Sequence, residues 1–363
     1  MKTILPDIIL KIHKLFIERG KKLYVVGGSC RDFLMDVTPK DFDLCTDATP
    51  SESIDILKSN NITHDYHGEA FGVVVAYDSD NIGYEIATFR TDLSEGRHPE
   101  VSFNATIEDD AARRDITINS IYYSLDSNEF IDINNGKADI DNRIIKMVGC
   151  AKDRLREDKL RVLRAIRFKH RYDFLLDNSI VKAIEEDTEI LTGISQERIW
   201  EEVIKSFKQV KHFDEYLISL QRLGLFKFVF PGFPADFTGK KWSKLEFYVA
   251  DILKHVPTKS KDSVIQKCKI EGGMIGEAFF LRDFITKFTP EQVFDFFKEK
   301  ERFHISDDTL RSLAKEYKFD TELTEKFIKF KPTVDGLEIA KKFKGKAISD
   351  EIKRLEFENF KLI

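Results

Sequence analysis

Near its N-terminus the chain carries Tyr24-Val25-Val26-Gly27-Gly28-Ser29-Cys30-Arg31-Asp32, followed after seven residues by Lys40-Asp41-Phe42-Asp43-Leu44. Residues i and i+2 of a strand point to the same side, so Asp41 and Asp43 would present two carboxylates together. Such a pair is costly unless a cation lies between them, and hard oxygen ligands select Mg²⁺ or Mn²⁺. Gly27 and Gly28 let the backbone approach a phosphate closely, and Arg31 can bind its charge. The stretch therefore predicts a metal-dependent site for nucleotide transfer.

The bulk composition is that of a globular protein. With 363 residues, 42% hydrophobic and 33% charged, the chain predicts two to four domains. No apolar run is long enough to cross a membrane, and the start of the chain shows no signal peptide, so we expect a cytoplasmic protein without a membrane partner. The four cysteines are scattered and form no CxxC pair, which argues against a zinc site or a disulfide framework.

The charge is unevenly distributed along the chain. The formal net charge is only −5, which argues against binding nucleic acid through the whole surface. Residues 151–171, in contrast, hold nine Lys or Arg against three Asp or Glu. Such a basic stripe can bind phosphates, because affinity follows the phosphates that are neutralised. The common alternative for a basic stripe is a solvated helix face.

The chain changes character near residue 150. Residues 1–150 mix helical and strand patterns, with expected strands at 23–26, 42–45, 71–77 and 84–89, which predicts an α+β domain with a small mixed sheet. Later residues show helical periodicity almost throughout. The expected helices are 156–171, 178–191, 195–209, 212–223, 242–255, 261–287, 290–299, 306–316 and 320–330.

A third acidic side chain is usually needed beside two metal-bridging aspartates in two-metal nucleotidyl transfer. Our candidate is Glu85, because a buried strand seldom carries an isolated glutamate without a partner. Asp110 and Asp115 are the rivals. An Asp-x-Asp pattern alone is most often a surface turn. Joined to the preceding glycine-arginine motif at this distance, it favours a catalytic site.

Two arginine clusters follow. Arg113 and Arg114 lie at the end of an acidic helix, where Arg114 could reach a triphosphate or ribose; an ion-paired helix end is an equal alternative. On a helix, Asp158, Arg161 and Arg164 would share one face. A carboxylate beside a guanidinium can read the edge of cytosine or adenine, whereas uracil and guanine present the opposite polarity. The alternative is an i,i+3 salt bridge, which is the commoner explanation for such spacing.

These clusters, in this order, resemble the class II tRNA nucleotidyltransferase and bacterial poly(A) polymerase family, part of the polymerase-β-like superfamily. The matching segments run from residue 24 to about 203: VVGGSCRD, KDFDL, GEAFGVV, TFRTDLSEGRHPEV, EDDAARRDITINS, REDKLRVLRAIRF and SQERIWEEV. The resemblance implies a nucleotidyltransferase head at 1–150, a nucleotide-selecting neck at 151–215, a helical body at 216–300 and a tRNA-binding tail at 301–363.

The resemblance also implies roles for individual residues. Gly28 and Arg31 would bind the incoming triphosphate, and Asp41 and Asp43 would bind Mg²⁺. To these we add two expectations from the residues themselves, Gly27 in the nucleotide-binding site and Glu85 in catalysis. The remaining nucleotide-binding residues would be Arg114, Asp158, Arg161, Arg164 and Arg167, with Asp158 and Arg161 selecting CTP and ATP. The implied partner is tRNA, and no DNA partner is expected.

Four activities occur within this family: addition of the whole CCA end, of CC only, of the final A only, or of a poly(A) tail. Residues 119–124 look more like the poly(A) polymerase version, whereas residues 68–73 and an intact loop at 90–99 favour CCA addition. We therefore expect CCA addition. Two other classes fit the sequence less well. An inactive RNA-binding protein on the same fold would have lost Asp41, Asp43 or Arg31, and the sequence keeps all three. A metal-dependent phosphohydrolase would need a further His-Asp cluster, which the helical region lacks.

Overall fold

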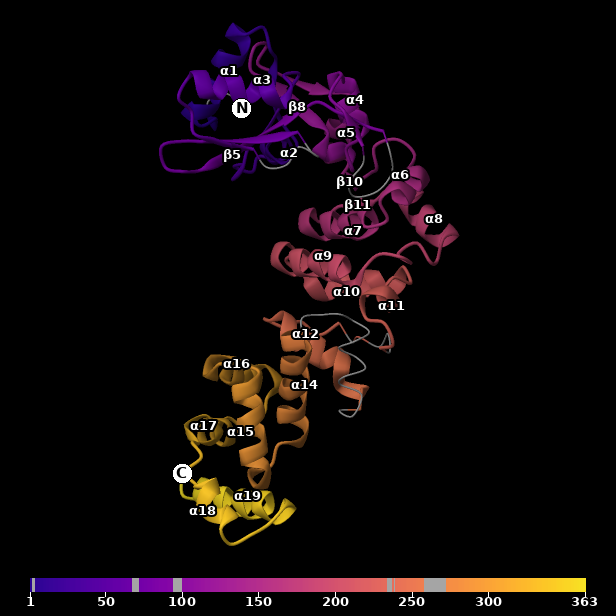
Figure 1. Ribbon diagram of the computed structural model, residues 1–363. Coiled ribbons are helices and arrows are strands. Elements are labelled where there is room, and N and C mark those ends of the chain that lie inside the picture. Colours follow the sequence, from indigo (N-terminus) through magenta and orange to yellow (C-terminus); the bar gives the residue numbers. More distant parts are fainter. Residues whose placement is uncertain (2–3, 67–71, 94–99, 234–236, 238, 258–271) are drawn as a thin grey trace. The chain divides into compact units, whose positions relative to one another are not determined.

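The computed structural model divides into two compact units, Met1–Ile194 and Ser195–Ile363, which are described separately (Figure 1). It describes residues 1, 4–66, 72–93, 100–233, 237, 239–257 and 272–363. Four expectations fall partly or wholly outside these residues: the segment 68–73, the first residue of the strand expected at 71–77, the loop 90–99 and the first part of the helix expected at 261–287.

A seven-stranded mixed sheet forms the centre of the first unit, in the order β3-β4-β5-β2-β1-β8-β9. Strand β1 pairs antiparallel with both β2 and β8, while β2 runs parallel to β5. The mixed α/β class predicted for this region is confirmed. The strands of this sheet are β1 (Leu23–Val26), β2 (Asp43–Thr46), β3 (His64–Tyr66), β4 (Val73–Tyr77), β5 (Gly83–Thr88), β8 (Ile121–Ser124) and β9 (Glu129–Asp132).

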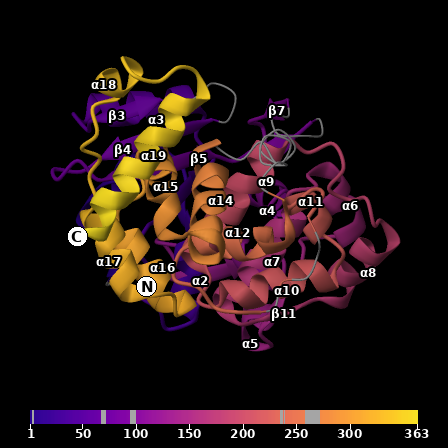
Figure 2. The ribbon, with the colours of Figure 1, turned by 90° about the horizontal axis from the view of Figure 1, so that it is seen from below.

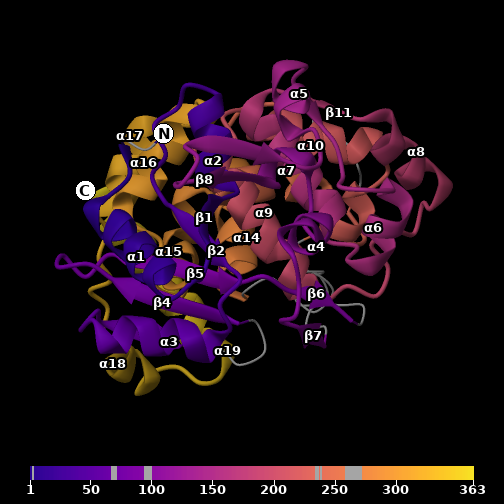
Figure 3. The same ribbon diagram turned by 90° about the horizontal axis from the view of Figure 1, so that it is seen from above.

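Two helices pack against the sheet and against each other (Figure 3). Helix α1 (Asp7–Glu18) contacts β1 and buries Ile9, Ile12 and Phe16, whose spacing places them on one helical face. Helix α3 (Pro50–Ser59) contacts β3 and β4; it begins with a capping box between Thr49 and Glu52 and with proline at its first position. Both helices thus follow from their local sequence.

The remaining elements of the first unit lie outside the seven-stranded sheet. The expected helix at 156–171 is wrong at Asp158, which has extended backbone (φ −140°, ψ 100°) and separates α6 from α7. The Asp158 carboxylate accepts from the amide of Leu160 (3.2 Å), a local bond that competes with helix formation. These elements are α2 (Gly28–Leu34), β6 (Thr91–Asp92), β7 (Val101–Ser102), α4 (Ile107–Ala112), the 3₁₀ turn η2 (Thr117–Asn119), α5 (Gly136–Asp141), β10 (Ile144–Ile145), α6 (Ala151–Glu157), α7 (Arg161–Tyr172), β11 (Leu175–Leu176) and α8 (Asn178–Glu186).

The described residues of the second unit form helices and 3₁₀ turns without a strand, as the sequence predicted. Phenylalanines fill its core: the centre of the Phe284 ring lies 4.8–6.1 Å from those of Phe280, Phe288, Phe296, Phe319 and Phe327. The helices and 3₁₀ turns are α9 (Gln196–Gln209), α10 (Phe213–Arg222), α11 (Phe226–Val229), α12 (Leu245–Ile252), η3 (Leu253–His255), α14 (Gly272–Lys287), η5 (Pro290–Gln292), α15 (Val293–Arg302), α16 (Asp307–Tyr317), α17 (Thr321–Lys329), α18 (Gly336–Ala340) and α19 (Lys346–Lys361).

Helix α19 was not expected from the sequence; it contacts α15 and α18 (Figure 2). Among the described residues, no helix is both long enough and apolar enough to span a membrane.

Candidate functional site

A cavity of about 640 Å³ in the first unit gathers most of the residues that the sequence singled out. Its volume is in the range of small-molecule pockets. Eight Arg or Lys side chains line it against five Asp, so the cavity favours an anionic ligand. The lining residues are Gly27, Gly28, Ser29, Arg31, Asp32, Val37, Thr38, Lys40, Asp41, Asp43, Arg113, Arg114, Asp115, Asn119, Asp158, Arg161, Arg164, Arg167, Phe168 and Arg171. Glu85 is the one predicted site residue that is not among them.

Gly27 joins strand β1 to helix α2 at the floor of this cavity. Its backbone (φ 75°, ψ −125°) is a conformation that only glycine adopts readily. The Gly27 amide donates to the carbonyl of Ile121 (3.0 Å) on β8. This amide is therefore engaged within the fold, and the positive φ explains why a glycine stands here. That Gly27 and Gly28 let the backbone approach a phosphate stays a prediction, and both residues line the cavity.

Arg31 is held from several sides. Its side chain is 4% exposed, and its Nε and Nη2 donate to Asp32 Oδ1 at 2.9 and 2.6 Å. Nη1 donates to Asn119 Oδ1. The guanidinium carbon lies 4.6 Å from the centre of the Tyr172 ring. Arg31 thus lines the cavity with a fixed orientation.

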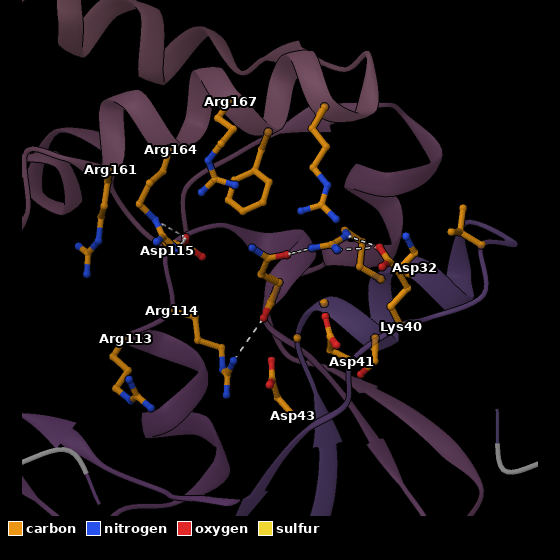
Figure 4. Close-up of a pocket in the computed structure, with 18 of the residues that line it drawn as sticks. Asp32, Lys40, Asp41, Asp43, Arg113, Arg114, Asp115, Arg161, Arg164 and Arg167 are labelled. Carbon is orange, nitrogen blue, oxygen red and sulfur yellow. Dashed lines mark hydrogen bonds and ion pairs between the residues drawn. The ribbon is translucent and has the colours of Figure 1, made fainter. Parts of the chain in front are cut away.

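Asp43 is the first residue of β2, Asp41 precedes it by two residues, and both line the cavity (Figure 4). Glu85 is the neighbour of Asp43 on the adjacent parallel strand, because Leu44 pairs with Ile86 in the next register position. Burial raises the pKa of the Asp43 carboxyl, and Glu85 and Asp41 raise it further against the opposing effect of Arg114 and Arg31. Negative charge therefore accumulates where a cation would be stabilising.

This chemistry fits a magnesium site that a substrate completes. Over the residues that the structure describes, no three His, Cys, Asp or Glu side chains are gathered closely enough to hold a metal ion. Mg²⁺ is usually bound in nucleotide enzymes by one or two carboxylates together with substrate phosphates and water. Asp41 and Asp43 fit that arrangement. The role of Glu85 as a third carboxylate stays a prediction.

Asp110, the first rival of Glu85, is fully buried and already neutralised. Its Oδ1 accepts from Arg113 Nε and Nη2 (2.9 and 2.6 Å), and its Oδ2 accepts from Arg114 Nη2 (3.0 Å) and from the Tyr122 hydroxyl (2.7 Å). Burial opposes ionisation, but Arg114 and Arg113 hold the pKa of Asp110 below its ordinary value. Asp110 fixes the two arginines beside the cavity and has no oxygen turned to a metal.

Asp115, the second rival, is paired with Arg164 of helix α7. Its Oδ2 accepts from Arg164 Nε (3.1 Å) and Nη2 (2.5 Å), and its Oδ1 accepts from the amide of Ile116. Despite burial, Arg164 holds the pKa of Asp115 below its ordinary value. The carboxylate thus ties helix α7 to the segment that follows Arg114.

Arg161, Arg164 and Arg167 project from α7 towards the cavity, opposite Asp41, Asp43 and Arg114 (Figure 4). Arg161 donates to Glu157 Oε2 and to the carbonyl of Arg154, both at 2.8 Å. The ion pair of Arg161 is therefore made with Glu157. Asp158 and Arg161 nevertheless line the same cavity, although they come from a turn and from the first residue of a helix.

Several lining residues were not singled out from the sequence as site residues. Phe168 and Arg171 extend the face of α7 that bears Arg164 and Arg167, and their i+3 and i+4 spacing was the signal that could have found them. Asp32 follows Arg31 and Lys40 precedes Asp41, so their place next to predicted site residues was the signal that could have found them. Val37 and Thr38 carried no signal in the sequence.

Two family comparisons agree with this geometry. Residues 23–146 match the poly A polymerase head domain, and residues 173–236 match the probable RNA and SrmB-binding site of polymerase A. Among curated relatives, the mouse mitochondrial CCA tRNA nucleotidyltransferase 1 is 34% identical over 252 residues, covering 67% of this chain and 56% of the relative. The CCA-adding enzyme of Lactobacillus gasseri is 38% identical, covering 56% of this chain and 51% of the relative. Poly(A) polymerase I of Haemophilus influenzae is 31% identical, covering 75% and 61%.

The fold also matches a solved structure. A crystal structure of the Bacillus stearothermophilus CCA-adding enzyme in complex with CTP superposes with a TM-score of 0.74 at 23% identity, covering 96% of this chain and 91% of that one. The fold and the site thus define a nucleotidyltransferase-like head followed by a helical region. The chain belongs to the class II nucleotidyltransferase family, which contains the CCA-adding enzymes and the bacterial poly(A) polymerases. Its sequence matches span about half to three fifths of these curated relatives' length.

Proposed function

We propose that the protein is a template-independent RNA nucleotidyltransferase that adds CCA to the 3′ end of tRNA from CTP and ATP. One observation carries this proposal: Asp41 and Asp43 share a single cavity with Asp158 and Arg161. The first pair suits the transfer of a nucleotide and the second suits the choice of its base. A cationic lining between them suits a triphosphate.

The transfer requires the 3′ hydroxyl of the RNA to form a bond to the α-phosphorus while the bond to the β-phosphate breaks and pyrophosphate leaves. Asp41 and Asp43 would hold Mg²⁺, which when bound favours deprotonation of the hydroxyl and neutralises charge on the phosphates. Arg31 and Arg114 face the same space, and their guanidinium groups neutralise the triphosphate and orient it. Because both arginines are already fixed by hydrogen bonds, little side-chain freedom is lost on binding.

Base choice would rest on polarity. The exocyclic amine of cytosine or adenine donates to a carboxylate such as that of Asp158, and the adjacent ring nitrogen accepts from a guanidinium such as that of Arg161. In uracil and guanine a carbonyl would face the Asp158 carboxylate, so two acceptors would meet. Their ring N–H would face the Arg161 guanidinium, so two donors would meet. Leaving buried polar groups unpaired disfavours the wrong base by a large factor.

The relatives support a choice within the family without deciding it. CCA-adding enzymes recur among the relatives, and CCA-adding enzymes with this fold have been solved in complex with CTP, ATP or tRNA. The alternative is a poly(A) polymerase, favoured by the Haemophilus influenzae relative, whose match covers the larger share of this chain. CC-only and A-only addition remain further alternatives. The four-domain division and the cytoplasmic location stay predictions.

The test supplies each nucleotide separately, with Mg²⁺, to a tRNA that lacks its last three residues and reads the product length. Addition of two C residues with CTP alone, and of a final A when ATP is added, supports the proposal. Long ladders with ATP alone would make the protein a poly(A) polymerase. Products that stop after two C residues with both nucleotides present would make it a CC-adding enzyme.

Two variants test the assignment of the residues. Asp43→Ala should abolish incorporation, because the metal site loses one of its two carboxylates. The matched control is Asp55→Ala, which removes an exposed carboxylate from α3. Full activity of Asp43→Ala would refute the catalytic role. Arg161→Lys should relax the choice of CTP and ATP over UTP and GTP; unchanged selectivity would refute the template role.

A further inference from the structure

We propose that Tyr172 is a positioning residue that holds the guanidinium of Arg31 at the phosphate side of the cavity. The inference rests on the proposed function, in which Arg31 binds the incoming triphosphate. Tyr172 itself is not among the residues that line the cavity, so it would act through Arg31.

The contacts of Arg31 divide into two kinds. Asp32 and Asn119 accept its hydrogen bonds, and such bonds lie near the plane of the guanidinium. In addition, the Arg31 Cζ lies over the Tyr172 ring, 4.6 Å from the ring centre. The hydrogen bonds hold the edge of the guanidinium, and the attraction of its charge to the face of the Tyr172 ring adds a further contact. Ring and hydrogen bonds together therefore fix the direction in which Arg31 presents its charge.

Tyr172 acts in this arrangement through its ring. Its hydroxyl oxygen is buried and makes no hydrogen bond within the described part of the chain. Burial raises the pKa of the Tyr172 phenol, so the ring is neutral at physiological pH. The ring of Phe168 stacks beside it (6.1 Å between centres, 8° between planes), and the Arg171 Cζ lies 5.1 Å from the centre of the Tyr172 ring. A ring fixed by these neighbours, with a quadrupole that attracts cations, suits a guanidinium.

The position of Tyr172 in the chain gives the contact a wider role. Tyr172 is the last residue of α7, the helix that begins at Arg161, whereas Arg31 belongs to α2. The contact therefore joins the arginine assigned to the triphosphate to the helix assigned to the base. A displacement of α7 would remove the ring from Arg31, so the phosphate and base contacts would be weakened together.

The test compares variants that keep or remove the ring. Tyr172→Leu keeps an apolar side chain but lacks the ring quadrupole, while Tyr172→Phe keeps the ring and removes only the hydroxyl. The matched control is Phe174→Leu, because Phe174 is buried with its ring 6.0 Å from that of Tyr172. Calorimetry measures the binding of CTP and of inorganic pyrophosphate with Mg²⁺, and steady-state incorporation gives kcat and KM for CTP and ATP.

Loss of a desolvated cation–π contact corresponds to roughly a thirtyfold weaker affinity. We expect Tyr172→Leu to weaken the binding of CTP and of pyrophosphate by about that factor. KM for both nucleotides should rise by the same factor with kcat nearly unchanged. Tyr172→Phe should restore binding, and Phe174→Leu should leave it unaltered. Thermal unfolding is measured for every variant, and Tyr172→Met takes the place of Tyr172→Leu should the latter be unfolded at the assay temperature.

Two results would overturn the inference while leaving the proposed function intact: wild-type affinity in Tyr172→Leu, or an equal loss of affinity in Phe174→Leu. A wild-type protein that binds neither CTP nor pyrophosphate would instead refute the proposed function.

Discussion

The replacement of Asp110 by asparagine is the most direct test of how the fold holds the cavity arginines. Asp110 is fully buried, and its carboxylate accepts hydrogen bonds from Arg113, Arg114 and Tyr122. Asparagine keeps the size of the side chain, but it loses the charge and turns an NH₂ group towards donors. We expect Asp110→Asn to lower the free energy of unfolding of the first unit and to weaken nucleotide binding.

The magnitude follows from the surroundings of the pair. Removing one partner of a buried ion pair costs about 3–5 kcal/mol. The Arg113 and Arg114 side chains are 20% and 18% exposed, so water can solvate them partly and the lower end applies. We therefore expect a loss of about 3 kcal/mol, which in a unit of this size lowers Tm by roughly 6–12 °C. Arg114 would also lose its main anchor, which should raise KM for CTP and ATP.

Thermal unfolding by circular dichroism and steady-state kinetics check both expectations. The matched control is Glu108→Gln, which removes an exposed negative charge from the same helix, α4. A surface substitution of this kind should change stability by no more than about 0.5 kcal/mol. The reasoning would be refuted by an Asp110→Asn variant that unfolds at the temperature of the control and keeps the wild-type KM.

Two further changes test local features. Gly27→Ala should lower the free energy of unfolding by about 1–3 kcal/mol, because a φ of 75° is strained for alanine. Space is not the cause, since the nearest atom, on Arg114, lies 3.6 Å from an added Cβ. Chemical denaturation should show a smaller loss for Gly28→Ala, and equal losses would contradict the strain argument. Burial, together with Glu246, raises the pKa of Glu277 to about 7, so the folded state binds more protons than the unfolded state between pH 4.5 and 7 and loses stability as the pH rises through that window. Glu277→Gln should therefore be more stable than wild type by roughly 1 kcal/mol at pH 8, a value reduced because the side chain is partly exposed, and equal to it near pH 4.5. Melting curves at both pH values decide this, and a stabilisation that is the same at both would contradict it.

The sequence predicted those parts of the fold whose signal is local. Strand β1 (Leu23–Val26) was predicted with its observed bounds, because a short β-branched run ends there at a glycine. Strand β8 (Ile121–Ser124) was missed because it is buried on both faces and shows no alternation that would mark a strand. Helix α19 was missed because its described buried residues are only Glu356 and Phe360, too few for an apolar stripe.

For the site, the sequence identified side chains better than their partners. Arg164 was placed on the correct face of α7, but its pairing with Asp115, 49 residues earlier, depends on tertiary structure. The break at Asp158 was missed because the residue can either continue a helix or bond its carboxylate to a nearby amide, and periodicity does not distinguish the two. Glu85 was chosen for its strand, and only the register with β2 shows that it neighbours Asp43.

The buried group formed by Asp110, Arg113, Arg114 and Tyr122 has a consequence for how this sequence can diverge. Each member satisfies a charge or a polar atom of another, so a single substitution leaves an unpaired group in a place with little water. Only a simultaneous change can avoid that penalty. Descendants of this chain are therefore expected to keep the four residues together or to replace them as a set, and sequence covariation among these positions would record that dependence.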